Sequence, residues 1–205
     1  MTSALPPADE ALVALSAALA ARRPGVLDPA LRRAASVAKP GAVEEALLQS
    51  YLFLGYPTAL NAFGVWREVS GEPAREPSPE TGPWEERGAA VCRTVYGGQY
   101  EALRANVRRL HPDLERWMVN EGYGRVLGRS GLPLATRELC IAALLAVLDV
   151  PRQLYSHLRG ALNAGASEAQ VGRALAIAAE VSEDGARERA AETWMSLRER
   201  SARDG

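Results

Sequence analysis

Apolar residues recur at helical spacing along most of this chain, and no segment alternates convincingly at period two. Leu12, Leu15 and Leu19, for example, follow one another at three- and four-residue steps, as on one face of a helix. The composition agrees, because Ala, Leu, Arg and Glu dominate while β-branched residues are sparse. The sequence therefore predicts an all-α fold.

A segment rich in Pro, Glu, Gly and Ser divides the expected helices into two groups. We expect a helical part over residues 1–70, a linker over 71–84 and a second helical part over 85–205. Thr136 is expected to cap one helix, and Ser167 with Gln170 to form a capping box on another. The expected helices span residues 9–22, 29–39, 42–54, 57–69, 85–95, 99–109, 112–127, 136–148, 151–165, 168–181 and 183–199.

The chain also matches itself at an offset of 128 residues, and both copies contain four helices of similar length. The coinciding pairs are Glu10 with Glu138, Val43 with Val171, Leu47 with Leu175 and Trp66 with Trp194. Chance matches in an alanine-rich chain are the alternative. We interpret the pattern as a degenerate repeat whose halves pack face to face as a pseudo-dimer.

The charge balance argues against two classes of partner. The 24 Lys and Arg residues nearly equal the 25 Asp and Glu residues, whereas a nucleic-acid surface needs a basic face. No uncharged apolar run reaches membrane-spanning length, and the first residues lack the pattern of a signal peptide. We therefore expect no nucleic-acid partner, no membrane association and a cytoplasmic location.

A helical hairpin over residues 137–165 carries the best candidates for chemistry. Glu138 opens an almost wholly apolar helix, and Gln153 and His157 lie four residues apart on the next one. Such a hairpin can bring a carboxylate and an imidazole together away from bulk water, as proton transfer requires. The structural alternatives are that Glu138 only interacts with the helix dipole and that His157 is a hydrogen-bonded core residue.

Glu121 is a second acidic candidate. Leu114, Trp117 and Met118 form an apolar stripe in which Glu121 occupies the next core position. The alternative is that Glu121 lies at the exposed edge of the stripe or pairs with an arginine.

Other kinds of chemistry have little support. Two histidines without an H-x-x-x-H motif disfavour a catalytic metal, and no phosphate-binding loop or nucleophile elbow is present. Cys92 and Cys140 lie far apart, and Cys140 falls within an apolar helix, where a thiol usually packs as a small hydrophobe. We expect no metal and no cofactor.

Several segments resemble the carboxymuconolactone decarboxylase family, which shares its fold with alkylhydroperoxidase D. The run TRELCIAALLAVLDVPRQLYSHLRGALNAGAS is the closest match, and HLRGALNAG, from His157 to Gly165, is its most specific part. The segments ERGAAVCRTVYGG and LERWMVNEGYGRVLGRSGL resemble the region that precedes this core. With EEALLQSYLFLGYPTALNAFGVWREV, the resemblance covers about residues 43–69 and 86–181.

The resemblance implies an all-helical bundle of the alkylhydroperoxidase D-like type that assembles as a homo-oligomer. The two cysteines of the peroxidase branch would fall at Val150 and Gln153, so the dithiol is missing and the decarboxylase branch is closer. That branch decarboxylates 4-carboxymuconolactone to an enol-lactone. By the same resemblance, Glu138 and His157 match the proton-relay residues, and Glu121 matches a second acidic position.

We therefore expect a cofactor-free enzyme that acts on a small organic acid or lactone, with His157, Glu138 and Glu121 as its catalytic residues. Gln153, Tyr123 and Tyr56 are the expected substrate-binding residues, and either Arg125 or Arg137 would hold a substrate carboxylate. Two alternatives are an antioxidant protein that uses Cys140 or Cys92 alone, and a non-catalytic helical scaffold or binder of a small ligand.

Overall fold

The computed structural model describes residues 4–23, 25–74 and 82–204, and every regular element in these ranges is helical. The all-α prediction is therefore confirmed. The helices before the linker are α1 (Pro7–Ala21), α2 (Leu27–Val37) and α3 (Pro40–Ser70). Those after it are α4 (Trp84–Tyr96), η1 (Gly97–Gln99), α5 (Tyr100–Leu110), α6 (Pro112–Trp117), η2 (Met118–Leu127), α7 (Leu134–Val147), α8 (Pro151–Asn163), α9 (Glu168–Ala179) and α10 (Asp184–Asp204).

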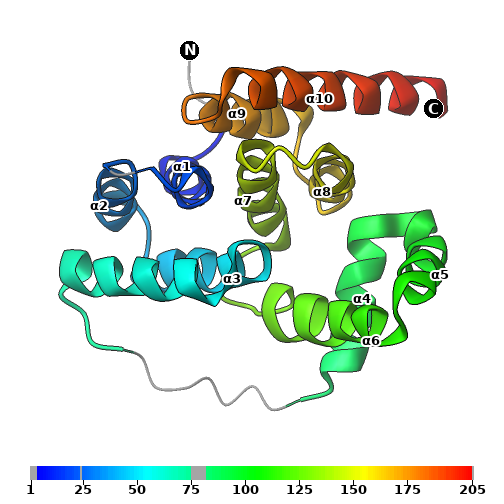
Figure 1. Cartoon of the computed structure of the whole chain (residues 1–205), viewed down its shortest axis with the longest axis horizontal. Coiled ribbons are helices and arrows are strands. Elements are labelled where there is room, and N and C mark those ends of the chain that lie inside the picture. Colours follow the sequence, from blue (N-terminus) through cyan, green and yellow to red (C-terminus); the bar gives the residue numbers. More distant parts are fainter. Residues whose placement is uncertain (1–3, 24, 75–81, 205) are drawn as a thin grey trace.

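Helix α7 lies at the centre of the molecule (Figure 1). It packs against α1 on one side, against α8 on the other and against α9, and it also contacts α3. Helices α4, α5 and α6 gather at one end of the bundle, where α4 packs along η2 and also contacts α8 (Figure 1). This arrangement places the α7–α8 hairpin between the helices α1 and α3 on one side and α4 on the other.

One hydrophobic core takes side chains from both parts of the chain. Leu12 and Leu15 of α1, Leu47 of α3, and Ile141 and Leu144 of α7 all belong to it and are almost fully buried. The expected division into residues 1–70 and 85–205 stays a prediction, and part of the expected linker, residues 75–81, lies outside the described residues. The internal repeat also stays a prediction.

Several local expectations can be compared with the helices. The capping box is confirmed, because Ser167 N donates to Gln170 Oε1 at 2.8 Å and Gln170 N donates to Ser167 Oγ at 3.2 Å. The cap expected from Thr136 is wrong, because α7 begins earlier and Pro133 occupies its N-cap position. Gly55 interrupts α3 with a φ of 79°, a left-handed conformation that glycine adopts without steric cost, so the expected break there is confirmed.

The segment η2 is a π-helix rather than the α-helical continuation of α6 that we expected. It approaches α4 very closely at two glycines. A Cβ atom on Gly88 would lie 2.0 Å from the Val119 carbonyl oxygen, and one on Gly124 would lie 2.0 Å from the Trp84 carbonyl oxygen. These two glycines therefore allow α4 and η2 to pack backbone against backbone.

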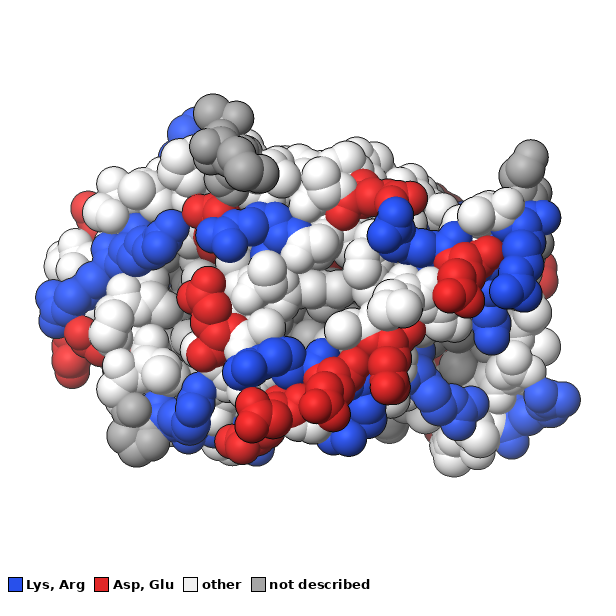
Figure 2. All heavy atoms as spheres, turned by 90° about the horizontal axis from the view of Figure 1, so that it is seen from above, with Lys and Arg blue, Asp and Glu red and all other residues white. Residues whose placement is uncertain are grey.

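The surface agrees with the near-zero net charge. On the face seen in Figure 2, Lys and Arg side chains are interspersed with Asp and Glu side chains. Within the described ranges, no helix has the length and apolar character needed to cross a membrane.

Candidate functional site

Glu138 and His157 meet inside the α7–α8 hairpin, as the sequence predicted. The His157 Nδ1 atom lies 2.7 Å from Glu138 Oε2. Glu138 is 0% exposed and His157 is 6% exposed, so the pair is shielded from water on almost every side. A hydrogen bond between an imidazole and a buried carboxylate fixes which ring nitrogen carries the proton. With an ionised carboxylate as the partner, Nδ1 carries a hydrogen and Nε2 is left to exchange a proton with another molecule.

The hairpin holds this geometry by helix packing. Leu154, Leu158 and Ala161 are buried on α8 together with His157, so the apolar face of α8 turns the imidazole toward α7. Gly160 lets the helices close, because a Cβ atom there would lie 2.8 Å from Glu138 Oε2. The same Cβ atom would lie 2.7 Å from Val95 Cγ1 of α4. Three helices therefore converge on the Glu138 carboxylate.

The other carboxylate oxygen of Glu138 has no such partner. Oε1 is buried and makes no hydrogen bond to any atom of the described residues. Leaving a buried acceptor unpaired typically costs about 1–3 kcal/mol, so such an atom in a folded protein needs an explanation. Phe53 of α3 completes the surroundings, with its ring edge-on to the His157 imidazole at a centroid distance of 5.7 Å.

Tyr123 lies in this core rather than on an open pocket wall. Its hydroxyl group is 3.0 Å from that of Tyr96, and both side chains are buried. Burial is the largest cause that raises the pKa of Tyr96, to about 12, and the negative charge of Glu138 adds to it. Burial likewise raises the pKa of Tyr123 well above its ordinary value. The sequence analysis did not single out Tyr96, which is the last residue of α4 and precedes two glycines.

The burial expected for Glu121 is wrong. Its side chain is half exposed, and its Oε1 lies 3.5 Å from Arg125 Nη1. Two residues of the apolar stripe face outward, since Leu114 is 48% exposed and Trp117 is 57% exposed, whereas Met118 packs against the core. Among the buried residues of α6 and η2, Glu115, Val119 and Tyr123 instead recur at four-residue steps. The structure thus corresponds to the alternative of an exposed edge with an arginine partner.

The other two expected substrate-binding residues lie at the surface. Gln153 is exposed in the first turn of α8, one turn before His157. Tyr56 is 62% exposed and stacks on Tyr51, with ring centroids 4.9 Å apart. Glu121 lies close enough to Tyr51 that its charge contributes, after burial, to raising the pKa of the Tyr51 phenol. Tyr56 and Glu121 therefore belong to one exposed region, near Tyr51.

The two arginines left open by the sequence have different surroundings. Arg137 is 0% exposed, and its guanidinium donates to Glu45 Oε2 at 2.7 Å and to Gln49 Oε1 at 3.1 Å. It also donates to the Arg129 carbonyl oxygen at 3.1 Å, so Arg137 is committed to the core and is not available to a substrate. Arg125 is half exposed, lies over the Trp84 ring at 5.2 Å, and remains the candidate for a substrate carboxylate.

The thiols and the surface hollows limit what this site can do. Cys92 and Cys140 are both buried, and burial raises the pKa of each thiol to about 12. In the described part of the chain, no three His, Cys, Asp or Glu side chains come together as metal ligands would. The main hollows lie between α9 and α10, between α8 and α10, and among α4, α5 and α6. Neither Glu138 nor His157 lines them.

Comparison with known proteins adds two findings. The profile of the carboxymuconolactone decarboxylase family matches residues 112–196, a range that contains η2, α7, α8 and α9. Peroxisomal protein 2 of Schizosaccharomyces pombe is 31% identical over 151 residues, which cover 69% of this chain and 69% of that protein. The matched profile includes both members of the buried carboxylate–imidazole pair.

Proposed function

Because this chain belongs to the carboxymuconolactone decarboxylase family, we propose that it catalyses cofactor-free proton transfer or decarboxylation on a small organic acid or lactone. The observation that carries the proposal is the 2.7 Å contact between His157 Nδ1 and Glu138 Oε2 inside the bundle. A carboxylate that orients a histidine is the usual support for a general acid or base. The cytoplasmic location stays a prediction.

In this mechanism His157 Nε2 is the atom that exchanges a proton with the substrate. Decarboxylation breaks a carbon–carbon bond, releases CO₂ and leaves the electron pair on the remaining carbon, which must then receive one proton. Protonated His157 would give its Nε2 proton to that carbon, while Glu138 balances the positive charge of the ring. The step needs no electron carrier, and the atoms and charges balance with these two residues alone.

The exposed candidates are proposed to act where the substrate enters. Gln153 would hydrogen-bond the substrate one turn from His157, and Tyr56 would cover it from α3. Glu121 is half exposed and is proposed as a second proton-transfer group at this entrance. Arg125 would exchange its contact with Glu121 for a bidentate contact with a substrate carboxylate.

The experiment measures turnover of 4-carboxymuconolactone and of simpler carboxylactones by the wild-type chain. We expect His157→Asn to lower kcat by about 10²–10⁴-fold, the usual contribution of a general acid or base. Glu138→Gln should lower kcat in the same way, and Glu168→Gln, which changes an exposed carboxylate on α9, should have no effect. Equal rates for wild type and His157→Asn would contradict the proposed role of the imidazole.

The closed surroundings of the pair give the scaffold alternative its specific support. If the wild-type protein turns over none of these compounds, a non-catalytic helical scaffold or ligand binder becomes the better interpretation. The antioxidant alternative requires a reactive thiol, whereas both thiols are buried with pKa values of about 12. We expect iodoacetamide to leave both thiols unmodified in the folded protein. Rapid alkylation of either thiol would support the antioxidant alternative.

A further inference from the structure

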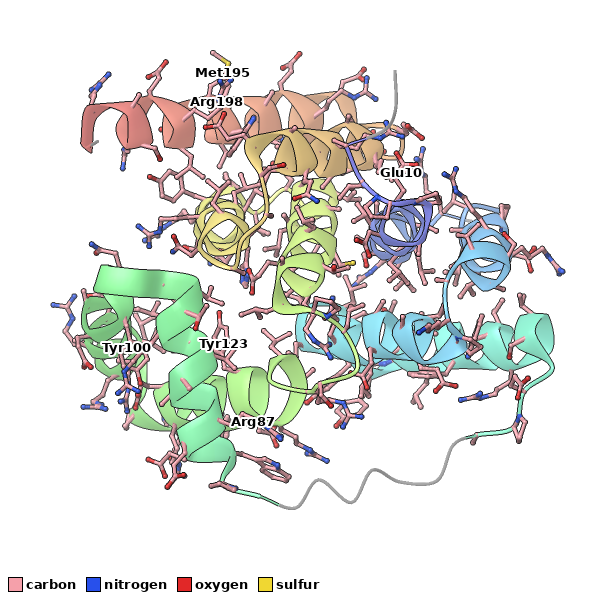
Figure 3. The ribbon with its side chains drawn as sticks, turned by 180° about the vertical axis from the view of Figure 1, so that it is seen from behind. Glu10, Arg87, Tyr100, Tyr123, Met195 and Arg198 are labelled. Atoms are coloured by element: carbon pink, nitrogen blue, oxygen red, sulfur yellow. The ribbon has the colours of Figure 1, made fainter. Side chains whose placement is uncertain are left out.

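Two buried tyrosines beside the Glu138–His157 pair have no part in the proposed reaction. Tyr96 comes from the end of α4 and Tyr123 from η2, and their hydroxyl oxygens are 3.0 Å apart. Their rings pack edge to face with centroids 5.9 Å apart. Tyr123 lies beside α4, toward the middle of the molecule, whereas Tyr100 lies at the outer end with α5 (Figure 3).

Helix α4 turns one face toward the Glu138 carboxylate. Cys92, Val95 and Tyr96 occupy this face at three- and four-residue steps, and all three are buried. Val95 Cγ1 and Glu138 Oε2 approach the same point above Gly160, which shows that the carboxylate lies against α4 at the level of Val95. The hydroxyl group of Tyr96 therefore projects from the helix that borders the carboxylate.

The Glu138 carboxylate and the two tyrosine hydroxyls leave one acceptor oxygen and one hydroxyl hydrogen unmatched. Glu138 Oε2 is bonded to His157, but Oε1 is buried without a partner among the described residues. The two tyrosine hydroxyls share one hydrogen bond, so one of their two hydrogens is used. The second has no acceptor among the described residues. Buried polar groups that do not touch are commonly joined by an internal water with two or more polar partners.

We propose that Tyr96 and Tyr123 are positioning residues for the Glu138–His157 pair, and that the Tyr96 hydroxyl reaches Glu138 Oε1 through one bridging water. The hydrogens of this series of hydrogen bonds all point toward Glu138, so its carboxylate accepts from both sides and is held in place. A carboxylate held in this way keeps a hydrogen on His157 Nδ1 and leaves Nε2 as the nitrogen that exchanges a proton. The inference deepens the proposed function, because Nε2 is the atom that reacts there.

Cys92, on the same face of α4, keeps its hydrogen, since burial raises the pKa of its thiol to about 12, and a thiol is only a weak hydrogen-bond donor. The residue for comparison with Tyr96 is Tyr155 of α8, a half-buried phenol whose ring lies under Arg200 at 5.5 Å. Replacing Tyr155 with phenylalanine removes the same hydroxyl group from a different environment and is the matched control.

The test uses the full chain and needs no substrate. It follows the imidazole ¹⁵N resonances and the Nδ1 proton of His157 by NMR. The chain contains two histidines, and His111 is an internal reference, because its Nδ1 accepts a hydrogen from Asp113 N at 3.1 Å. His111 must therefore carry its hydrogen on Nε2, the opposite tautomer from His157.

In Tyr96→Phe we expect the His157 Nδ1 proton to exchange with water about tenfold faster, the factor expected for the loss of one hydrogen bond to a charged group. The His157 ¹⁵N shifts should move toward a mixture of tautomers, with those of His111 unchanged. Tyr123→Phe should cause a smaller change in the same direction, and Tyr155→Phe should cause none.

Wild-type values for His157 in a folded Tyr96→Phe protein would overturn the inference, and so would an equal change in Tyr155→Phe. If Tyr96→Phe does not fold, Tyr123→Phe decides the matter by the same signals, and wild-type values there would overturn it. Because the NMR measurement is made without substrate, a lack of turnover would contradict the proposed function but not the NMR result. A negative NMR result would exclude the positioning role of the two tyrosines and would not affect the proposed role of His157.

Discussion

Arg137 and Glu138 are neighbours on α7, and both are fully buried, yet their surroundings differ sharply. Arg137 is fixed in the core by hydrogen bonds from its two terminal nitrogens to Glu45, Gln49 and the Arg129 carbonyl, while its Nε is buried without a partner among the described residues. Glu138 shares one oxygen with His157 and leaves the other without a protein partner. A buried polar atom left open next to a titratable ring is typical of a functional position rather than of a purely structural one.

The ion cluster around Glu45 gives a prediction about acid stability. Burial acts to raise the pKa of Glu45, but hydrogen bonds from Arg129 and Arg137 outweigh it and hold the pKa below its ordinary value. A carboxyl group with a lowered pKa in the folded state stabilises that state above its unfolded pKa. This stabilisation is lost as the pH falls through the folded value.

We therefore expect Glu45→Gln to lower the free energy of unfolding by about 3 kcal/mol at pH 7, because it leaves two arginines facing a neutral amide. The difference from wild type should shrink as the pH falls below the ordinary glutamate range. Urea unfolding at several pH values measures it. Glu168→Gln is the control, because its pair with Arg198 is more than half exposed and should contribute at most about 0.5 kcal/mol. A difference that stays constant down to strongly acidic pH would contradict the account.

Among the elements, η2 departs most from the sequence prediction, because its π-helical turns pack directly on α4. Gly124→Ala would place a Cβ atom 2.0 Å from the Trp84 carbonyl oxygen, so the two backbones would have to separate. We expect it to lower the free energy of unfolding by about 3 kcal/mol. Gly122→Ala is the matched control two residues away, because nothing lies within 4 Å of its Cβ position.

The control should be neutral or stabilising by up to about 1 kcal/mol, since alanine restricts the unfolded chain more than glycine does. Thermal and urea unfolding of the two variants measure both effects. Equal stability of Gly122→Ala and Gly124→Ala would show that the close approach of η2 and α4 does not constrain the fold.

The comparison of η2 with the α7–α8 hairpin shows what local sequence determines. The Glu138–His157 contact was predictable, because two adjacent helices joined by a short turn must pack against each other. The outward orientation of Glu121 was not, since periodicity defines an apolar face without saying which side of the helix the rest of the chain covers. The position of Tyr96 in the site was not predictable for a related reason. Its partner Tyr123 is 27 residues away, and the sequence around Tyr96 indicates only the end of a helix.

At the scale of the whole molecule, ion pairs join α1 and α3, which precede the linker, to α7 and α9, which follow it. Arg137 of α7 bonds Glu45 of α3 at 2.7 Å, and Arg173 of α9 bonds Glu10 of α1 at 2.5 Å. By the offset of 128 residues, position 173 corresponds to position 45. Glu45 and Arg173 would therefore be corresponding residues with charges of opposite sign. This is compatible with the degenerate repeat, which stays a prediction.

The outward-facing apolar residues of α6 lead to a prediction about assembly. Leu114 and Trp117 are three residues apart on one helical face and are 48% and 57% exposed. Adjacent large apolar side chains at the surface are typical of an interaction site, and the sequence predicts a homo-oligomer. We therefore expect light scattering to give a mass that is a multiple of 22.0 kDa.

Leu114→Glu combined with Trp117→Glu should convert this assembly to a monomer, because two charges would have to be buried without partners. Met195→Glu is the control: Met195 is 59% exposed on α10, on the side of the molecule away from α6, and should leave the mass unchanged (Figures 1 and 3). Far-ultraviolet circular dichroism should confirm that both proteins keep their helix content, since the replaced side chains contribute little to the core. A wild-type chain that scatters as a monomer would contradict the predicted assembly. A double variant that keeps the full mass would instead show that copies meet through a face other than that of α6.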